Sequence, residues 1–173
     1  LEMLAIDLLH QIIKHLLISI SKQVQHLNHL SQSQQLSVLE LIKAATDIDG
    51  VPPIAEHVLL HLPHGGDKSD SHLVIEKDNQ VIAYAHLDIT DLVAGPSVEA
   101  VVHPKYRGQG FGTALLNEAI TICGDKTRIW SHGDLPQAQS IATSLELERL
   151  WANLQMSKKL FEIEDITSKY LIR

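Results

Sequence analysis

The sequence predicts an α/β domain in which a mixed central sheet is flanked by helices. Helical and strand signals alternate along the 173 residues in the order α-α-β-β-β-α-β-α-β, which requires helices packed against a sheet. Two strand-like segments meet at the short polar turn Asp78-Asn79, which predicts an antiparallel hairpin. Further along, an apolar strand runs through a glycine-rich turn directly into an amphipathic helix. The length fits one domain.

Residues 1–22 form an apolar extension ahead of this domain. Apolar residues recur every four positions, which predicts one wide apolar helical face made of Leu4, Leu8, Ile12, Leu16 and Ile20. Interspersed charges argue against a membrane-spanning helix or a signal peptide, and the polar face lacks the Lys/Arg cluster of a membrane-surface helix. We therefore expect a helix packed on the domain or on a partner. Because the chain begins with Leu1, a truncated or artificially extended N-terminus is also open.

Two helices are expected before the first strands. Ser31 to Gln34 has the spacing of a capping box, and apolar residues at helical spacing continue to Thr46, so the first helix begins there and is broken at Asp49-Gly50. A short second helix over Ile54–Leu62 follows two prolines and ends in a segment rich in Pro and Gly.

The remaining elements follow from periodicity and residue type. Alternating or β-branched runs predict strands, and apolar residues at helical spacing predict helices. The expected strands cover His72–Lys77, Gln80–Ile89, Ser97–His103, Thr127–Ser131 and Arg149–Ser157, and the expected helices cover Phe111–Cys123 and Leu135–Leu145.

Composition excludes several classes of function. A net charge of −7 argues against a nucleic-acid binder, which needs a cationic face, but leaves room for one small anionic ligand. The single cysteine, Cys123, excludes an internal disulfide or a multi-cysteine zinc site and is compatible with a reducing cytoplasm. His57, His61 and His64 are close in sequence, but they lack a zinc-protease Glu and a convincing third ligand, so no metal is expected.

The segment 101–113 carries most of the chemical information. Gly108, Gly110 and Gly112 allow the backbone to take positive φ and a ligand to approach closely. The N–H groups of such a turn, together with the positive end of the following helix, form an anion site, to which Arg107 and Lys105 add positive charge. We interpret the turn as a pyrophosphate site. The alternative is a tight turn without a ligand.

The type of phosphate site can be narrowed. The turn lacks the Lys-Ser/Thr ending of a Walker A loop, and Thr113 stands where a dinucleotide fingerprint has its third glycine. The pattern Arg-x-x-Gly-x-Gly resembles motif A of the GNAT superfamily of N-acetyltransferases, which implies the GNAT acyl-CoA N-acyltransferase fold and acetyl-CoA as co-substrate. The resemblance implies acetyl-CoA contacts from Ala100, Val101, Val102, Arg107, Gly108, Gln109, Gly110, Phe111, Gly112 and Thr113.

A closer resemblance, to the mycothiol synthase family, covers about residues 25–162. It rests on Asp49-Gly50-Val51-Pro52-Pro53-Ile54-Ala55-Glu56, on 99–104, on Ile129-Trp130-Ser131-His132-Gly133-Asp134-Leu135-Pro136-Gln137-Ala138, and on residues between Leu150 and Leu160. The resemblance implies acetylation of the cysteinyl amine of a cysteine–glucosamine–inositol conjugate. It is limited to the first of two tandem GNAT domains, and acetyl transfer is assigned to the second.

This resemblance implies a domain organisation. Residues 23–162 are expected to form the GNAT domain, and 163–173 a tail or linker to an absent second domain. The length then suggests half an enzyme, with that second domain as its partner.

Candidate residues for the chemistry are few. Glu99 occupies the place where many GNAT enzymes carry a general base, although a carboxylate on an amphipathic strand is usually just solvated. Glu56 matches a substrate-contacting position of the family, or it is a first-turn acid favoured by the helix dipole. The tyrosine general acid of many GNAT enzymes is replaced by Ala142. His132 is expected to hydrogen-bond around its Gly133 turn or to border the substrate cleft.

Two alternatives to an acetyltransferase of mycothiol synthesis therefore remain. One is a non-catalytic module that binds acetyl-CoA and supports a catalytic domain, which Ala142 favours. The other is a GNAT enzyme for another small amine.

Overall fold

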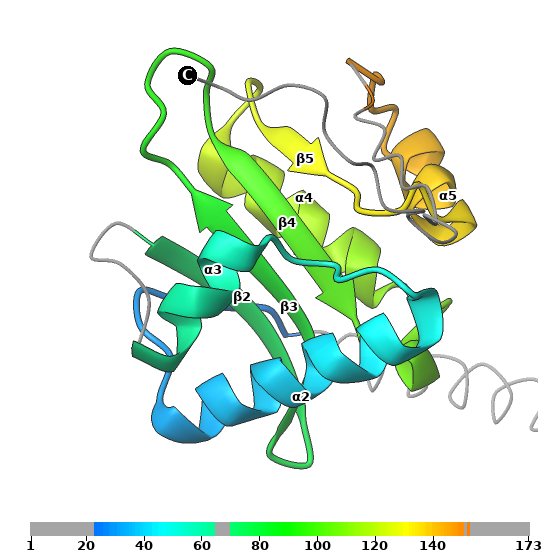
Figure 1. Cartoon of the computed structure of the whole chain (residues 1–173). Coiled ribbons are helices and arrows are strands. Elements are labelled where there is room, and N and C mark those ends of the chain that lie inside the picture. The colour runs from blue at the N-terminus through cyan, green and yellow to red at the C-terminus, as the bar shows by residue number, and fades with distance from the viewer. Residues whose placement is uncertain (1–22, 65–69, 151, 153–173) are drawn as a thin grey trace, which may run out of the picture.

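A five-stranded mixed sheet forms the centre of the molecule in the computed structural model, which describes residues 23–64, 70–150 and 152. Its strands are β1 (Gln25–Leu27), β2 (Asp70–Lys77), β3 (Gln80–Asp88), β4 (Ser97–Val102) and β5 (Arg128–Trp130), in the spatial order β1-β2-β3-β4-β5. The first four strands pair antiparallel, and β5 pairs parallel to β4. The expectation of a mixed sheet flanked by helices is confirmed (Figure 1).

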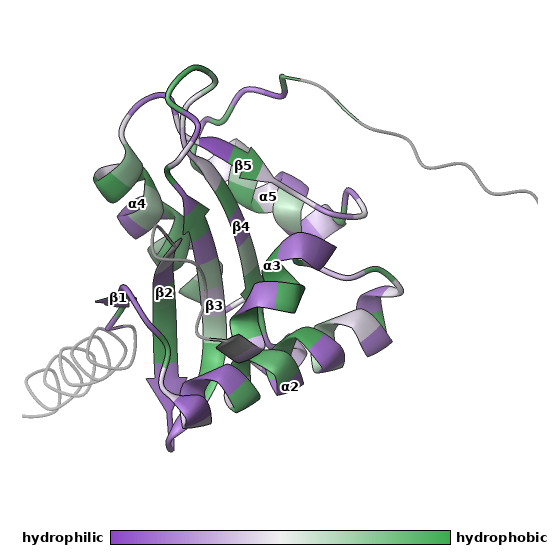
Figure 2. Cartoon of the chain, turned by 60° about the vertical axis from the view of Figure 1, so that its left-hand side comes forward, coloured by the Kyte–Doolittle hydropathy of each residue, from purple (hydrophilic) through white to green (hydrophobic). Residues whose placement is uncertain are grey.

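Helices cover both faces of the sheet. The helices are α2 (Gln32–Asp49), α3 (Glu56–His61), α4 (Phe111–Cys123) and α5 (Pro136–Ser144), with short 3-10 helices at Leu62–His64 and Pro104–Tyr106. One core cluster packs α2 and α3 on Val74, Tyr84 and Val101, and a second packs α4 on the opposite face of the same strands. Figure 2 shows polar and apolar stretches alternating along α2, as expected for a helix with one buried face.

Local sequence signals place several boundaries correctly. The Ser31 side chain accepts from the Gln34 N–H and the Gln34 side chain accepts from the Ser31 N–H, which is the predicted capping box. The helix ends at Gly50, whose φ of 74° is left-handed. Asp78 and Asn79 both have positive φ, as a two-residue hairpin requires.

Other boundaries differ from the expectation. Helix α3 begins at Glu56 instead of Ile54, because Ala55 is extended and Ile54 is buried in the core. Strand β1 was not expected, since three residues are too few to show a period; it forms by pairing with β2. Arg149 and Leu150, the first residues of the expected last strand, are not in a strand. Of the rest of that segment only residue 152 is described, and the predicted extension 1–22 also lies outside the described residues.

Within the described part of the chain, no helix combines the length and apolar character needed to span a membrane.

Candidate functional site

The glycine-rich turn between β4 and α4 presents unpaired backbone to solvent. Gly108 and Gly110 have φ values of 72° and 82°, and both are exposed. Gly110 is the N-cap of α4, whose first turn holds no acidic residue and receives no side-chain cap within the described part of the chain. The first N–H groups of a helix have no partner inside it. This uncapped N-terminus can therefore bind an anion.

Side chains below the turn hold it in place. Phe111 is buried, and its ring meets that of Tyr106 edge-on with centroids 6.4 Å apart. The His103 ring accepts from the Lys105 N–H at 3.2 Å and so forms the start of the turn. Phe111 can offer a ligand only its backbone, because its side chain belongs to the core.

Gly112 is needed for packing, which is a different reason from the one the sequence suggested. A Cβ at Gly112 would lie 2.8 Å from Ile141 Cδ1 in α5 and 3.6 Å from Val102 Cγ2 in β4. Gly108, in contrast, has nothing within 4 Å of its ideal Cβ position. Gly108 and Gly110 thus provide the left-handed backbone of the turn, whereas Gly112 permits close packing of α4 against α5 and β4.

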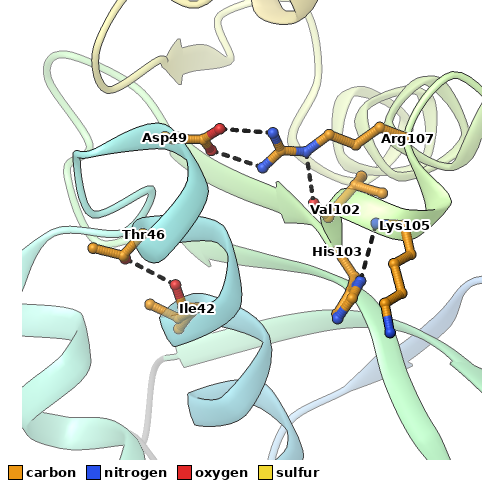
Figure 3. Close-up of polar contacts among 7 residues, drawn as sticks. All are labelled: Ile42, Thr46, Asp49, Val102, His103, Lys105 and Arg107. Carbon is orange, nitrogen blue, oxygen red and sulfur yellow. Dashed lines mark hydrogen bonds and ion pairs between the residues drawn. The ribbon is translucent and has the colours of Figure 1, made fainter.

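Arg107 is engaged by protein groups on three of its nitrogens (Figure 3). Its two terminal nitrogens donate to the two carboxylate oxygens of Asp49, each at 2.7 Å, and its Nε donates to the Val102 carbonyl at 3.1 Å. In this structure the guanidinium therefore faces the end of α2.

Glu99 lies buried in strand β4, between Ala55 before α3 and His132 after β5. Its Oε2 accepts from the Ala55 N–H at 2.6 Å, just before α3 begins. Its Oε1 lies 3.6 Å from His132 Nε2, an ion-pair distance. Burial alone would raise the pKa of Glu99, but His132 and the Ala55 N–H favour the carboxylate and leave that pKa below its ordinary value. We call Glu99, His132 and Ala55 the carboxylate junction.

His132 reaches Glu99 because of a tight turn. Gly133 has a φ of 81°, and a Cβ there would lie 2.6 Å from Val51 Cγ2, so the β5–α5 loop packs directly on the α2–α3 loop. The contact with Glu99 raises the pKa of His132 although burial opposes it. His132 thus belongs with the candidate site. The signal that could have identified this role is the Ser-His-Gly-Asp block.

A row of polar residues continues from the junction across the sheet. In the strand register Glu99 lies opposite His86, and His86 opposite His72. All three are buried, and the His72 ring also bonds the Tyr84 hydroxyl at 2.9 Å. Neither His72 nor His86 stands out in the sequence, because a polar residue at an alternating position of a strand is equally compatible with the solvated face of a sheet.

The other residues noted in the sequence lie at different distances from the glycine-rich turn and the carboxylate junction. Glu56 is exposed at the first turn of α3, next to Ala55 of the junction. Ala142 lies in α5 and offers no hydroxyl. Cys123 lies at the far end of α4 from the glycine-rich turn, and burial raises the pKa of its thiol. Among the residues that the structure describes, no group of three His, Cys, Asp or Glu side chains is placed to hold a metal ion.

Comparisons with known proteins agree with this arrangement. The model described as "Acetyltransferase (GNAT) family" matches residues 38–144. The mycothiol acetyltransferase of Streptosporangium roseum is 40% identical over 139 residues, covering 80% of this chain and 41% of that protein. The one of Acidothermus cellulolyticus is 44% identical over 127 residues, covering 72% and 39%. The chain thus spans about two fifths of the length of these relatives.

A solved structure shows the same fold. A predicted acetyltransferase with acetyl-CoA from Clostridium acetobutylicum gives a TM-score of 0.56 at 13% identity, covering 77% of this chain and 96% of that one. Both resemblances drawn from the sequence, to the GNAT superfamily and to the mycothiol synthase family, are therefore confirmed.

Proposed function

Because the chain belongs to the acetyltransferase (GNAT) family, we propose that it binds acetyl-CoA at the glycine-rich turn and takes part in acetyl transfer to a small amine. The observation that carries the proposal is the uncapped N-terminus of α4, with exposed left-handed glycines before it. The N–H groups from Gly108 to Thr113 suit the pyrophosphate, because they combine free donors with the positive end of the helix dipole.

The remainder of acetyl-CoA has a suitable strand edge. The pairing of β4 with β5 ends at Glu99 and Trp130, so in the described structure the β5-side edge of Ala100–Val102 carries no paired strand. Backbone N–H groups there are suited to the pantetheine arm and the thioester carbonyl. This is a backbone role, which tolerates a change of side chain.

For the amine, we propose the cysteinyl nitrogen of a cysteine–glucosamine–inositol conjugate, acetylated in the cytoplasm. The names of the relatives support this substrate class. The thioester supplies an activated acetyl group: a C–N bond forms, the C–S bond breaks, and one proton leaves the nitrogen while the thiol gains one. Glu99 is the candidate base, and Glu56 at the start of α3 is the candidate substrate contact.

The intact protein is proposed to contain a second acetyltransferase domain, since relatives extend well beyond the matched region. In this arrangement residues 23–162 form the first domain, and 163–173 lead to the second.

A second candidate function is a non-catalytic acetyl-CoA module. Two observations favour it: Ala142 provides no proton donor, and both Glu99 oxygens already face protein groups. The module and the enzyme share the ligand and differ only in turnover.

One pair of measurements separates these functions. Calorimetry of the 173-residue chain with CoA tests ligand binding, and a turnover assay with acetyl-CoA and the cysteine–glucosamine–inositol amine tests catalysis. Binding with turnover supports the enzyme, and binding without turnover supports the module. Absence of CoA binding would contradict both.

A further inference from the structure

The last residue of α2 is joined to the glycine-rich turn by a two-pronged ion pair. Asp49 accepts two hydrogen bonds of 2.7 Å from Arg107, the residue immediately before Gly108. The two residues are 58 positions apart in sequence, and Figure 3 shows their side chains pointing toward each other, Asp49 from α2 and Arg107 from the segment that follows β4. Parallel N–H···O bonds of this kind restrict orientation as well as distance.

Asp49 is poorly placed without Arg107. The carboxylate lies at the C-terminus of a helix, where the dipole disfavours negative charge, and its side chain is only 8% exposed. A buried charge that loses its partner is strongly destabilising. The side chain of Arg107 is 20% exposed and is held at a third point by the Val102 carbonyl. Moving this guanidinium toward a ligand would break all three bonds.

We propose that Asp49 is a positioning residue for the glycine-rich turn. It clamps Arg107 between the end of α2 and the end of β4, and the clamp holds the backbone from Gly108 to Gly110 in the conformation that presents free N–H groups. Arg107 then serves the anion site through the backbone, and the backbone carries the phosphate contacts. This inference rests on the proposed binding of a pyrophosphate-containing ligand.

A direct contact between Arg107 and the phosphate would predict the opposite effect of an Asp49 substitution on binding. If Arg107 were itself the phosphate ligand, Asp49 would compete with the phosphate for it, and removing the charge of Asp49 would tighten binding. If Asp49 is a positioning residue, removing its charge weakens binding. The sign of the change therefore separates the two roles.

The first test uses hydrogen exchange of the ligand-free chain. Asp49→Asn keeps the size of the side chain but turns an NH₂ group toward the guanidinium, so the two-pronged bond is lost. The matched control is Asp47→Asn, which removes the exposed Lys43–Asp47 pair on the same helix. We expect faster exchange over residues 107–113 in Asp49→Asn and no change there in Asp47→Asn. Unchanged exchange of this segment in Asp49→Asn overturns the inference.

The second test measures CoA affinity by calorimetry. We expect Asp49→Asn to weaken binding about tenfold, in keeping with the loss of one charge-assisted pair. Arg107→Lys keeps the positive charge but loses the fork, so it weakens binding similarly, and the double variant is no worse than either single one. Tighter binding in Asp49→Asn, or full binding in Arg107→Lys, overturns the inference.

The two proposals fail in different ways. If the unaltered chain does not bind CoA, the proposed function fails, while the exchange comparison still decides whether Asp49 positions the turn. If Asp49→Asn does not fold, hydrogen exchange of ligand-free Arg107→Lys decides the inference, because it reports on the turn without a ligand: faster exchange over residues 107–113 supports the clamp, and unchanged exchange overturns it.

Discussion

The carboxylate junction lies at the middle of β4 and the glycine-rich turn follows the end of the same strand, but the two are built differently. The turn offers backbone N–H groups that have no partner in the described structure, at the exposed glycines before α4. The junction brings charged side chains together, and Glu99 already faces both Ala55 and His132. A site whose donors are free is ready for a ligand, whereas a site whose charges neutralise each other must rearrange before it can move a proton. The comparison indicates that binding is the better-prepared half of the proposed function.

The largest effect is expected from a negative side chain in the glycine-rich turn, which tests whether this turn binds the anion. Gly110→Glu puts a carboxylate at a helix N-terminus meant for an anion and a Cβ at a φ of 82°. We expect CoA affinity measured by calorimetry to fall by about a hundredfold or more.

Gly110→Ala is the control, because it introduces the same backbone strain without the charge. Its CoA affinity is expected to fall by at most about fivefold, because the cost of a left-handed non-glycine residue weakens binding only where the ligand-free turn relaxes out of that conformation. If Gly110→Glu binds CoA as tightly as the unaltered chain, the turn is not the anion site.

The junction is tested by Glu99→Gln. If Glu99 is the base, turnover of the 173-residue chain should fall by about a hundredfold with little change in CoA affinity, since general base catalysis contributes that much. Exposed Glu148→Gln serves as the control. Equal turnover in the two variants would assign Glu99 a structural role and favour the hypothesis of a non-catalytic acetyl-CoA module.

Gly112 is expected to contribute to the stability of the fold through packing, which can be measured apart from ligand binding. Gly112→Ala forces a Cβ to within 2.8 Å of Ile141 Cδ1, so we expect a loss of about 1–2 kcal/mol in the free energy of unfolding, as for other overpacked sites. Urea unfolding measures this change. Adding Ile141→Ala should remove the clash and make the Gly112→Ala substitution nearly neutral. A substitution at Gly112 that is equally costly in the Ile141→Ala background would contradict the packing explanation.

The smallest expected effect is the pH dependence of the junction. The pKa of Glu99 is lowered, so its contribution to stability is present above the ordinary value of 4.5 and is lost as the pH falls through the lower folded value. The pKa of His132 is raised, so its contribution is present below 6.5 and is lost as the pH rises through the higher folded value.

The two signs define a window for the measurement. Comparing urea unfolding of the unaltered chain with that of His132→Gln should give the largest difference between these two ordinary values. About 1 kcal/mol is expected there, declining above the raised pKa of His132, because the pair is only half-buried. A difference that is independent of pH would show that His132 contributes by packing alone.

Much of the fold could be predicted because its signals are local. The capping box at Ser31, the left-handed end at Gly50 and the Asp78-Asn79 turn each depend on residues a few positions apart. Strand β1 could not be predicted, since its three residues become a strand only through pairing with β2, more than forty positions away. The start of α3 was misplaced because burial of Ile54 in the core took precedence over the helix-starting prolines.

The candidate site divides in the same way. The glycine-rich turn was identified from its own sequence, and the structure adds the free N-terminus of α4 behind it. The sequence could not show the packing role of Gly112, because the atom that a Cβ there would meet first comes from α5. Glu99 was noted as a candidate, but its contacts with Ala55 and His132 depend on two loops meeting over β4.

The sequence by itself determined the fold class, the family and the position of a turn suited to an anion. Those properties depend on periodicity, caps and a contiguous motif, all of which act over short distances along the chain. Only the tertiary structure decided what the charges do. Asp49 meets Arg107 and Glu99 meets His132 because the sheet brings the ends of distant elements together. A charge must be paired once it is buried, and the identity of its partner depends on packing, which no spacing along the sequence records.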